Sequence, residues 1–359
     1  MKVQIVDPPA YTPPYDHALC AALADLGLDV ELITSPFAYG SVPEPAGYVR
    51  RELFRRSGSA TARALRLAEH VPAMLRYRRL ATAADIVHFQ WLTLPAVDRP
   101  LLPRGRPLVI TAHDILPRER IAGSHAAQRR LYQDFDAVIA HSQAGRQRLI
   151  DDAGLDPAKV HVIPHGAFSH LAAISPGSLP AELDAAAGRP VVLYFGLIRP
   201  YKGLDVLLEA WPGVGGDAEL WIVGRPRFEI NNLRSDDPTV RWVPRFVSDE
   251  ELAACFRRAD LVVLPYREIE QSGVLATALA FGSPVLASDV GGFGEIAQAG
   301  AARLVPPGDA TALREAIIEL LADKPARRSL SDAALALAAG PLSWKSVAEQ
   351  TSALYTSLR

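Results

Sequence analysis

The feature that most constrains this fold is a series of short, apolar, β-branched runs separated by helix-length stretches rich in Ala, Leu and Arg. The runs are Val3–Val6, Val30–Thr34, Ile86–Phe89, Leu108–Thr111, Ala137–Ala140, Val160–Ile163, Val191–Phe195, Glu219–Val223, Leu261–Leu264 and Pro284–Ala287. Strands of a parallel sheet are buried on both faces and are joined by crossovers that are usually helical. The alternation therefore predicts an α/β protein whose parallel sheets are covered by helices.

The length of the chain and a break in this series predict two domains. A chain of 359 residues with 49% hydrophobic content exceeds one compact domain and can supply two cores. A polar stretch near Ser169–Pro190 interrupts the strands. We expect an N-terminal domain over 1–170, a linker over 171–189 and a second domain over 190–342. The amphipathic stretch 343–359 is expected to form a helix that packs back on the first domain.

Charge and cysteine content exclude several classes of protein. A formal net charge of −2 gives no overall attraction to nucleic acid. Two cysteines far apart in the sequence, Cys20 and Cys255, form neither a disulfide framework nor a metal motif. No apolar run reaches the roughly 18 residues of a membrane span, and no signal peptide is recognised. We expect a cytoplasmic protein.

Three histidines directly follow predicted strands of the first domain. His113, His141 and His165 come after the strands that begin at 108, 137 and 160. Ligands of open parallel sheets bind at the carboxyl ends of the strands, so the three rings could face one cleft. The alternative is that each ring caps a helix or bonds a loop carbonyl. No HxxxH or HxH pair supports a metal site, and none is expected.

The second domain opens with a glycine turn that carries two cations. Gly196 ends a strand, and Arg199 and Lys202 follow before Gly203 and a helix. A guanidinium and an ammonium at a strand end suit a diphosphate, although they could also be solvated loop charges. The absence of GxxxxGK[ST] excludes a Walker loop.

A second anion site is predicted where Ser272, Gly273 and Val274 begin a helix. Their backbone N–H groups would point along the positive end of the helix dipole, toward the same diphosphate. An ordinary small-residue helix cap is the alternative.

The order of these motifs identifies a resemblance. They are Gly196…Arg199…Lys202-Gly203, Val240–Val247 with Asp249-Glu250-Glu251-Leu252, Ala259-Asp260…Leu264-Pro265, Ser272-Gly273-Val274, Ala278…Ala280…Gly282…Pro284-Val285, Gly291-Gly292…Glu295 and Pro306-Pro307-Gly308-Asp309. This order resembles the retaining family 4 glycosyltransferases of the GT-B fold, with two Rossmann-like domains whose parallel sheets face a central cleft. Segments 111–114, 137–142 and 162–166 carry the resemblance into the first domain.

The resemblance implies roles for individual residues. Arg199 and Lys202, with Gly196 and the amides of 272–274, would hold the donor diphosphate. Arg245, Phe246 and Val247 would flank the base through backbone groups, and His113 would sit beside the transferred sugar. The cations would replace a metal ion, so neither metal nor cofactor is expected.

Two departures from the family pattern concern its paired glutamates and its first loop. The glutamate positions fall on Ile269 and Thr277. Glu270, or less favourably Glu268, would then contact the donor sugar, and the Thr277 hydroxyl would lie near the ribose.

The family's glycine-rich loop is replaced by the proline- and aromatic-rich segment 7–17. We assign Tyr11, Tyr15, Asp16 and His17, together with His141 and His165, to an acceptor pocket. The alternative is a rigid connection in which Asp16 caps a helix.

These features predict a metal-independent retaining transfer of a sugar from a UDP- or GDP-sugar to an acceptor hydroxyl. The catalytic group would be His113, Arg199, Lys202 and Glu270. A nucleotide-sugar epimerase and a catalytically weak nucleotide-sugar-binding protein are the alternatives. An NAD-dependent oxidoreductase is disfavoured, because Asp7-Pro8-Pro9 stands where GxGxxG would follow the first strand.

One segment of the chain is strongly basic, although the net charge of the whole chain is slightly negative. Residues 50–79 carry nine arginines against Glu52 and Glu69: Arg50, Arg51, Arg55, Arg56, Arg63, Arg66, Arg76, Arg78 and Arg79. A solvated amphipathic helix over 62–80 is one interpretation. The other is contact with an anionic membrane face or with a lipid-linked or phosphorylated acceptor.

Overall fold

The computed structural model describes residues 1–37, 42–54, 63–92, 94–116, 124–183, 188–214, 216, 218–230, 233 and 235–359. They form two compact units, Met1–Pro164 with Trp344–Arg359, and His165–Ser343. The predicted linker at 171–189 belongs to the second unit, which begins at His165. The reason is burial: Ala167 and Leu183 lie in the hydrophobic core of that unit.

The first unit is built on a seven-stranded parallel sheet of order β3-β2-β1-β4-β5-β6-β7. Its strands are β1 (Lys2–Asp7), β2 (Asp29–Thr34), β3 (Val49–Glu52), β4 (Ile86–Phe89), β5 (Leu108–Thr111), β6 (Ala137–Ala140) and β7 (Val160–Val162). Its helices are α1 (Pro13–Asp25), α2 (Arg63–Leu80), α3 (Pro95–Asp98), α4 (Ser124–Gln133), α5 (Gln143–Asp151) and α13 (Trp344–Ser357).

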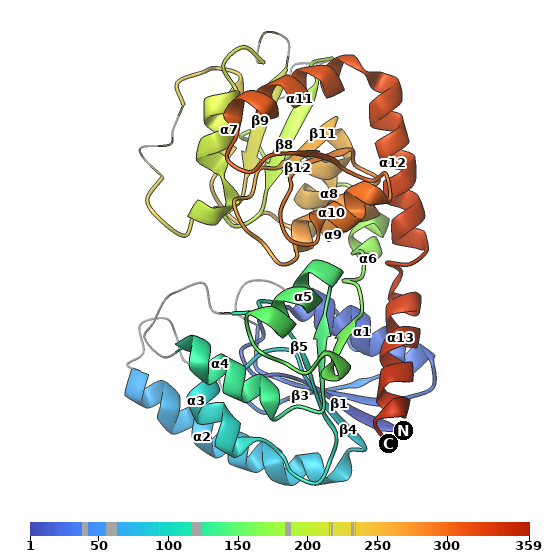
Figure 1. Cartoon of the computed structure of the whole chain (residues 1–359). Coiled ribbons are helices and arrows are strands. Elements are labelled where there is room, and N and C mark those ends of the chain that lie inside the picture. Colours follow the sequence, from blue (N-terminus) through green and yellow to red (C-terminus); the bar gives the residue numbers. More distant parts are fainter. Residues whose placement is uncertain are drawn as a thin grey trace. The chain divides into compact units, whose positions relative to one another are not determined.

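Strand β4 shows how the two faces of this sheet are covered. Val87 and Phe89 point into the core that α2, α4 and α5 complete. His88 points to the opposite face, where its ring bonds Tyr355 of α13. Helix α13 lies beside α1 on that face, although more than 300 residues separate them in the sequence (Figure 1).

The second unit has a six-stranded parallel sheet of order β10-β9-β8-β11-β12-β13. Its strands are β8 (Val191–Phe195), β9 (Glu219–Val223), β10 (Val240–Val243), β11 (Leu261–Leu264), β12 (Val285–Ser288) and β13 (Arg303–Val305). Its helices are α6 (Ser169–Ala173), α7 (Leu204–Ala210), α8 (Asp249–Arg258), α9 (Gly273–Ala280), α10 (Phe293–Gln298), α11 (Ala310–Ala322) and α12 (Lys324–Ala339). Alternate residues of β8 enter two cores, Leu193 on the face of α8 and α9, and Val192 and Tyr194 on the face of α7 and α11.

Candidate functional site

The glycine turn after β8 holds the ammonium of Lys202 in a buried position. Lys202 ends the short 3₁₀ helix η4 (Pro200–Lys202) and is only 7% exposed. Its Nζ lies 5.1 Å from the ring centroid of Tyr266, and a Cβ added to Gly196 would lie 3.1 Å from it. Gly196 also has φ +101°, a backbone conformation that L side chains rarely adopt, so the backbone and the close packing together favour glycine at 196. Arg199, three residues earlier, is exposed.

Helix α9 begins at Gly273, as predicted, and its first turn reaches the same glycine. The Ser272 hydroxyl caps this helix by accepting a hydrogen bond of 3.3 Å from the Leu275 N–H. A Cβ on Gly196 would lie 2.9 Å from a methyl carbon of Val274. The structure thus brings together the two predicted anion-binding features, the Lys202 ammonium and the start of α9.

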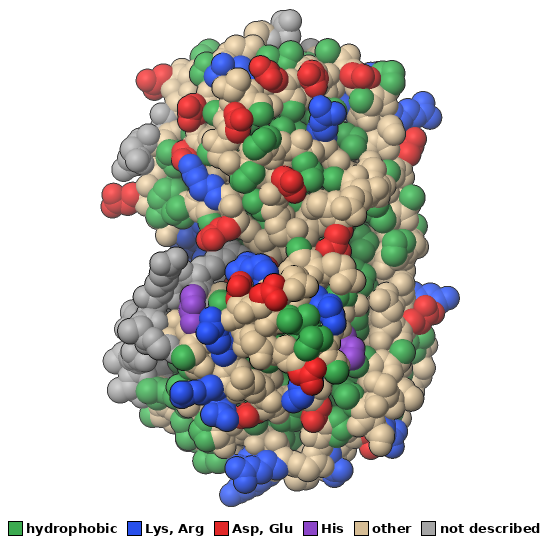
Figure 2. Space-filling model, viewed as in Figure 1, with side chains coloured by type: hydrophobic (Ala, Val, Ile, Leu, Met, Phe, Trp, Pro, Cys, Tyr) green, Lys and Arg blue, Asp and Glu red, His purple; other side chains and the backbone are tan. Residues whose placement is uncertain are grey.

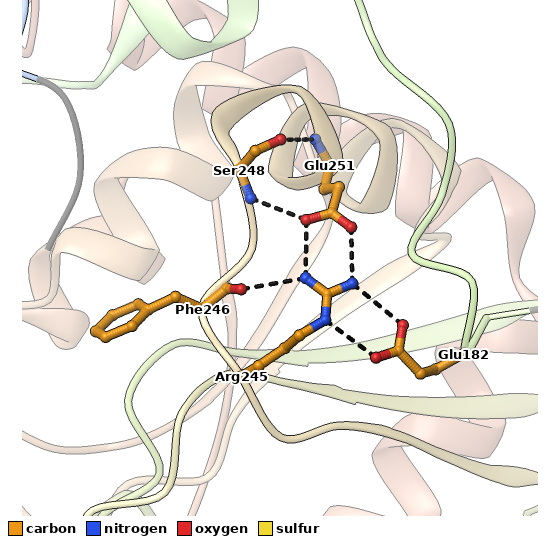
Figure 3. A network of polar contacts seen from close by, with 5 residues as sticks. All are labelled: Glu182, Arg245, Phe246, Ser248 and Glu251. Carbon is orange, nitrogen blue, oxygen red and sulfur yellow. Dashed lines mark hydrogen bonds and ion pairs between the residues drawn. The ribbon is translucent and has the colours of Figure 1, made fainter.

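Arg245 is held by two carboxylates through its side chain (Figure 3). It bonds Glu182 at 3.0 and 3.2 Å and Glu251 at 3.0 and 2.8 Å, and these hydrogen bonds raise its pKa. Glu251 also closes a capping box with Ser248 at the start of α8. The guanidinium is therefore committed to shaping this loop. Phe246, beside it, is 42% exposed, and Val247 is half-buried.

The altered glutamate motif lies between β11 and α9. Glu268 is exposed and Glu270 is half-buried. The Gly291-Gly292 turn packs on this segment, because a Cβ on Gly291 would stand 1.9 Å from the Ile269 carbonyl oxygen. Thr277 is 5% exposed, and its hydroxyl donates a hydrogen bond of 2.8 Å to the Gly273 carbonyl within α9.

In the first unit, His113 lies at the centre of an aromatic cluster. The ring is 3% exposed and stacks on Trp91 with centroids 5.0 Å apart. Tyr15 meets it edge-on at 4.9 Å, and His141 lies at 5.1 Å. Two of the three predicted imidazoles are therefore adjacent. The third, His165, belongs to the second unit, where it contacts Phe168 at 5.2 Å.

A pair of buried carboxylates fixes the loop after β1. Asp7 accepts hydrogen bonds from the backbone N–H groups of Tyr11, at 2.9 Å, and Thr12, at 3.4 Å. Burial raises the pKa of Asp7 to about 6, although a hydrogen bond from Asp16 opposes that shift. Burial and the neighbouring Asp7 raise the pKa of Asp16 as well. A proton shared between the two carboxyl groups accounts for this pairing.

The suggestion that Asp16 caps a helix is wrong, because Thr12 occupies the N-cap position of α1 and Asp16 lies within the helix. Of the other residues assigned to the acceptor pocket, Tyr11 is 57% exposed and meets Trp91 edge-on. His17 is half-buried and bonds the Tyr48 hydroxyl at 2.9 Å. A cavity of about 210 Å³ opens beside Asp16, lined also by Thr34, Ser35, Arg50 and Glu52.

Several groups near these sites were not found from sequence. Trp91, which covers one face of His113, follows β4 in a segment without a motif. Glu182 lies in the segment that we took for a linker. Tyr355 is separated from its partner His88 by 267 residues. A buried polar contact between residues so far apart has no local sequence signal.

Two further properties concern metals and membranes. Among the residues that the structure describes, no group of three or more His, Cys, Asp or Glu could hold a metal ion. No helix within the described ranges is long and apolar enough to cross a membrane. Cys20 and Cys255 are both buried free thiols.

Comparisons with known proteins identify the family to which this two-unit chain is similar. Residues 15–167 match the family described as Glycosyltransferase Family 4, and residues 189–323 match Glycosyl transferases group 1. The phosphatidyl-myo-inositol mannosyltransferase of Mycobacterium leprae is 31% identical over 289 residues, which cover 76% of this chain and 74% of that protein. A D-inositol 3-phosphate glycosyltransferase of Nocardia farcinica is 30% identical over 303 residues, covering 76% of this chain and 66% of its own length.

Solved structures share the fold over the whole chain. The sucrose-phosphate synthase of Thermosynechococcus elongatus has a TM-score of 0.77 at 22% identity, covering 100% of this chain and 99% of its own. Anabaena HepE, solved with UDP and glucose, has a TM-score of 0.79 at 21% identity and covers 100% of both chains. Together these findings define a glycosyltransferase with the GT-B fold. The chain belongs to glycosyltransferase family 4.

Proposed function

We propose that this glycosyltransferase transfers a sugar from a nucleotide-diphosphate sugar, UDP- or GDP-linked, to an acceptor hydroxyl with retention and without a metal ion. The observation that carries the proposal is the meeting of the Lys202 ammonium and the start of α9 at Gly196. HepE, a structural neighbour, was solved with UDP-glucose, which supports a UDP-linked donor. The comparisons do not favour an epimerase or a catalytically weak binding protein.

In this proposal the departing diphosphate is stabilised by fixed positive charge. Lys202 acts at the leaving oxygen, Arg199 closes over the phosphates from the exposed side, and the 272–274 amides point at the same group. A leaving phosphate oxygen takes the proton of the attacking acceptor on the same face of the sugar, so no protein nucleophile is required. The role of Mg²⁺ elsewhere falls to these cations.

The loops around the proposed diphosphate site also offer contacts for the sugar and the base of the donor. Glu270, half-buried beside the Gly291-Gly292 turn, suits the sugar hydroxyls better than exposed Glu268. Backbone groups of 245–247 contact the base, because the Arg245 guanidinium is already engaged by two carboxylates. Thr277 offers the ribose only a hydroxyl that already donates to the Gly273 carbonyl.

The acceptor is proposed to bind the first unit. The exposed ring of Tyr11 and the cavity beside Asp16 supply an aromatic wall and hydrogen-bonding groups for a polyhydroxylated molecule. His17 adds a second polar group on α1. His113, proposed to lie beside the transferred sugar, is buried and in edge-on contact with Tyr15. His165, which the sequence also assigned to the acceptor, lies in the second unit.

Thermal unfolding with UDP, GDP, ADP and their sugars tests the donor. A nucleotide at one hundred times its Kd should add about 2.7 kcal/mol of stability, and EDTA should leave both this shift and turnover unchanged. The anomeric configuration of the sugar released by slow donor hydrolysis reports retention. If no nucleotide raises the unfolding temperature, the proposed donor is wrong. If EDTA abolishes turnover and Mg²⁺ restores it, the enzyme depends on a metal ion.

We also propose reversible contact of the first unit with an anionic membrane surface, through helix α2. Arg76 and Arg79 are exposed, as is Leu75 at 45%, whereas Met74 and Tyr77 face the core. Figure 2 shows Lys and Arg side chains on the face of this unit near α2 to α4. The predicted patch is smaller than expected, because Arg51 is paired with Glu31. Arg55, Arg56 and the side chains of Arg63 and Arg66 lie outside the described residues.

Liposome co-sedimentation tests this contact. Replacing Arg76, Arg78 and Arg79 by glutamine should lower partitioning onto anionic vesicles roughly 100-fold at low salt, at about 1 kcal/mol per residue. Glutamine at the exposed Arg303, Arg328 and Lys345 removes the same charge elsewhere and serves as the control. Equal, negligible pelleting with and without anionic lipid would favour a soluble acceptor and no membrane contact.

A further inference from the structure

A continuous path of hydrogen bonds, part-buried at His141 and buried from His113 onward, runs across the first unit, from the loop after β7 to helix α13. It passes through one side chain just after each of the strands β6, β5 and β4, and then through a side chain within β4. Its members are Ile163 (backbone carbonyl), His141, His113, Gln90, His88 and Tyr355. His113, Gln90, His88 and Tyr355 are each at most 3% exposed. Water therefore contributes little to the order of protons between His113 and Tyr355.

The carbonyl at one end fixes the direction of the path. The Ile163 oxygen can only accept, so His141 must donate from Nδ1, over 2.9 Å. Burial lowers the pKa of His141 to about 4, so at neutral pH its other nitrogen carries a lone pair. His113 Nδ1, 3.3 Å from that nitrogen, must then carry the proton between them.

The same reasoning determines Gln90. A neutral His113 with its proton on Nδ1 has a lone pair on Nε2, which lies 3.0 Å from Gln90 Oε1, an atom that cannot donate to it. The two orientations of an amide have the same shape, so hydrogen bonding decides between them. The structure places Gln90 Nε2 3.3 Å from His88 Nε2. The order of protons requires the two amide atoms to be exchanged, so that the NH₂ group faces His113 and the amide oxygen faces His88.

The hydrogen bonds of His88 and Tyr355, at the other end of the path, are compatible with this arrangement of protons. His88 donates from Nε2 to the Gln90 oxygen and to the Thr111 hydroxyl, which is 2.8 Å away. Burial lowers the pKa of His88 to about 3, so its Nδ1 carries a lone pair and accepts from the Tyr355 hydroxyl over 2.6 Å. Every bond then has one donor and one acceptor. The opposite amide orientation would require His113 to be an imidazolium, with the desolvation cost of a buried charge.

We propose that these residues form a one-directional hydrogen-bond chain that holds His113 as the neutral Nδ1–H tautomer, with Gln90 as a positioning residue for the loop after β5. Both nitrogens of His113 are engaged and its ring is stacked on Trp91, so the ring supports the acceptor surface and is not a general base. The importance of this loop for turnover rests on the proposed function. The tautomer of His113 is independent of that function, because it follows from the hydrogen bonds alone.

Nitrogen-15 NMR of the full-length protein with labelled histidines tests the tautomer directly. His113, assigned with a His113→Gln variant, should show a protonated Nδ1 and a bare Nε2 at neutral pH without any ligand. His88 should show the reverse pattern. A doubly protonated His113, or a proton on Nε2 alone, would overturn the chain.

The variant Gln90→Met tests the positioning role, because it keeps nearly the same volume and removes both amide groups. Turnover of the donor should fall roughly fivefold to tenfold, the value of one buried hydrogen bond, with KM for the donor within about twofold. The His113 signals should also report a mixture of tautomers. Gln128→Met, at another buried glutamine of the same unit, should change neither.

The outcomes separate the two proposals. Unchanged His113 signals and unchanged turnover in folded Gln90→Met would sink the positioning role. The expected tautomer in a protein that binds no nucleotide sugar would leave the chain intact and overturn the proposed function.

Discussion

Lys202→Ala is expected to lower turnover of the nucleotide-sugar donor by roughly 10²-fold or more, the effect of removing one preorganised charge-stabilising donor. Lys202 is 7% exposed, and its ammonium lies close to Gly196 and the Tyr266 ring. Solvent therefore screens it poorly, and no neighbouring water replaces it cheaply at the leaving oxygen. The measurement is kcat and KM for the donor, with the melting temperature as a check on folding.

Two comparisons sharpen this result. Lys202→Arg should also lose most turnover, because a planar guanidinium is larger than an ammonium and cannot present its charge at the same point beside Gly196 and Tyr266. Lys345→Ala, which removes an ammonium that is 80% exposed on α13, should leave kinetics unchanged. If folded Lys202→Ala turns over donor at the wild-type rate, Lys202 is not part of the diphosphate site.

Gly203→Ala should destabilise the second unit by about 3 kcal/mol or more, combining backbone strain with overpacking. Gly203 has φ +64°, and an added Cβ would stand 1.9 Å from the Pro265 carbonyl oxygen. The obstacle is backbone, which cannot rotate away, so the turn that carries Lys202 must move. Turnover should fall with stability.

Gly308→Ala is the matched control in the same unit. Gly308 has φ +78°, but nothing lies within 4 Å of its Cβ position. Only the left-handed backbone penalty of about 1–2 kcal/mol should appear. Urea unfolding followed by tryptophan fluorescence compares the two variants. Equal losses of stability would show that the close approach to Pro265 is relieved and does not constrain the turn.

The interior strands could be predicted from sequence, whereas of the four edge strands only β7 was predicted. The predicted bounds of β4, β5, β6, β8, β9 and β11 agree with the structure. The strand series missed β3, β10 and β13, which lie at sheet edges. Strands covered on both faces are almost wholly apolar, whereas edge strands such as β3, Val49–Glu52, expose charged side chains and lose the apolar signal.

Some parts of the candidate site could likewise be predicted from the sequence, and others could not. The turn from Gly196 to Gly203 and the start of α9 could be found, because glycine, cations and helix caps leave local signals at fixed spacing. Their meeting at Gly196 depends on β8 and β11 being neighbours in the sheet. Glu182 was missed because its partner Arg245 is 63 residues away in the sequence.

The sequence by itself determined the α/β class, the family and the residues that could face a diphosphate, since these depend on residue type and short-range spacing. The tertiary structure alone decided that Asp16 of α1 pairs with Asp7 of β1, that Arg245 is held by two carboxylates, and that Tyr355 reaches His88 across 267 residues. The physical reason is that a buried polar group must find its partner wherever packing places one, and packing brings together residues that no local pattern connects.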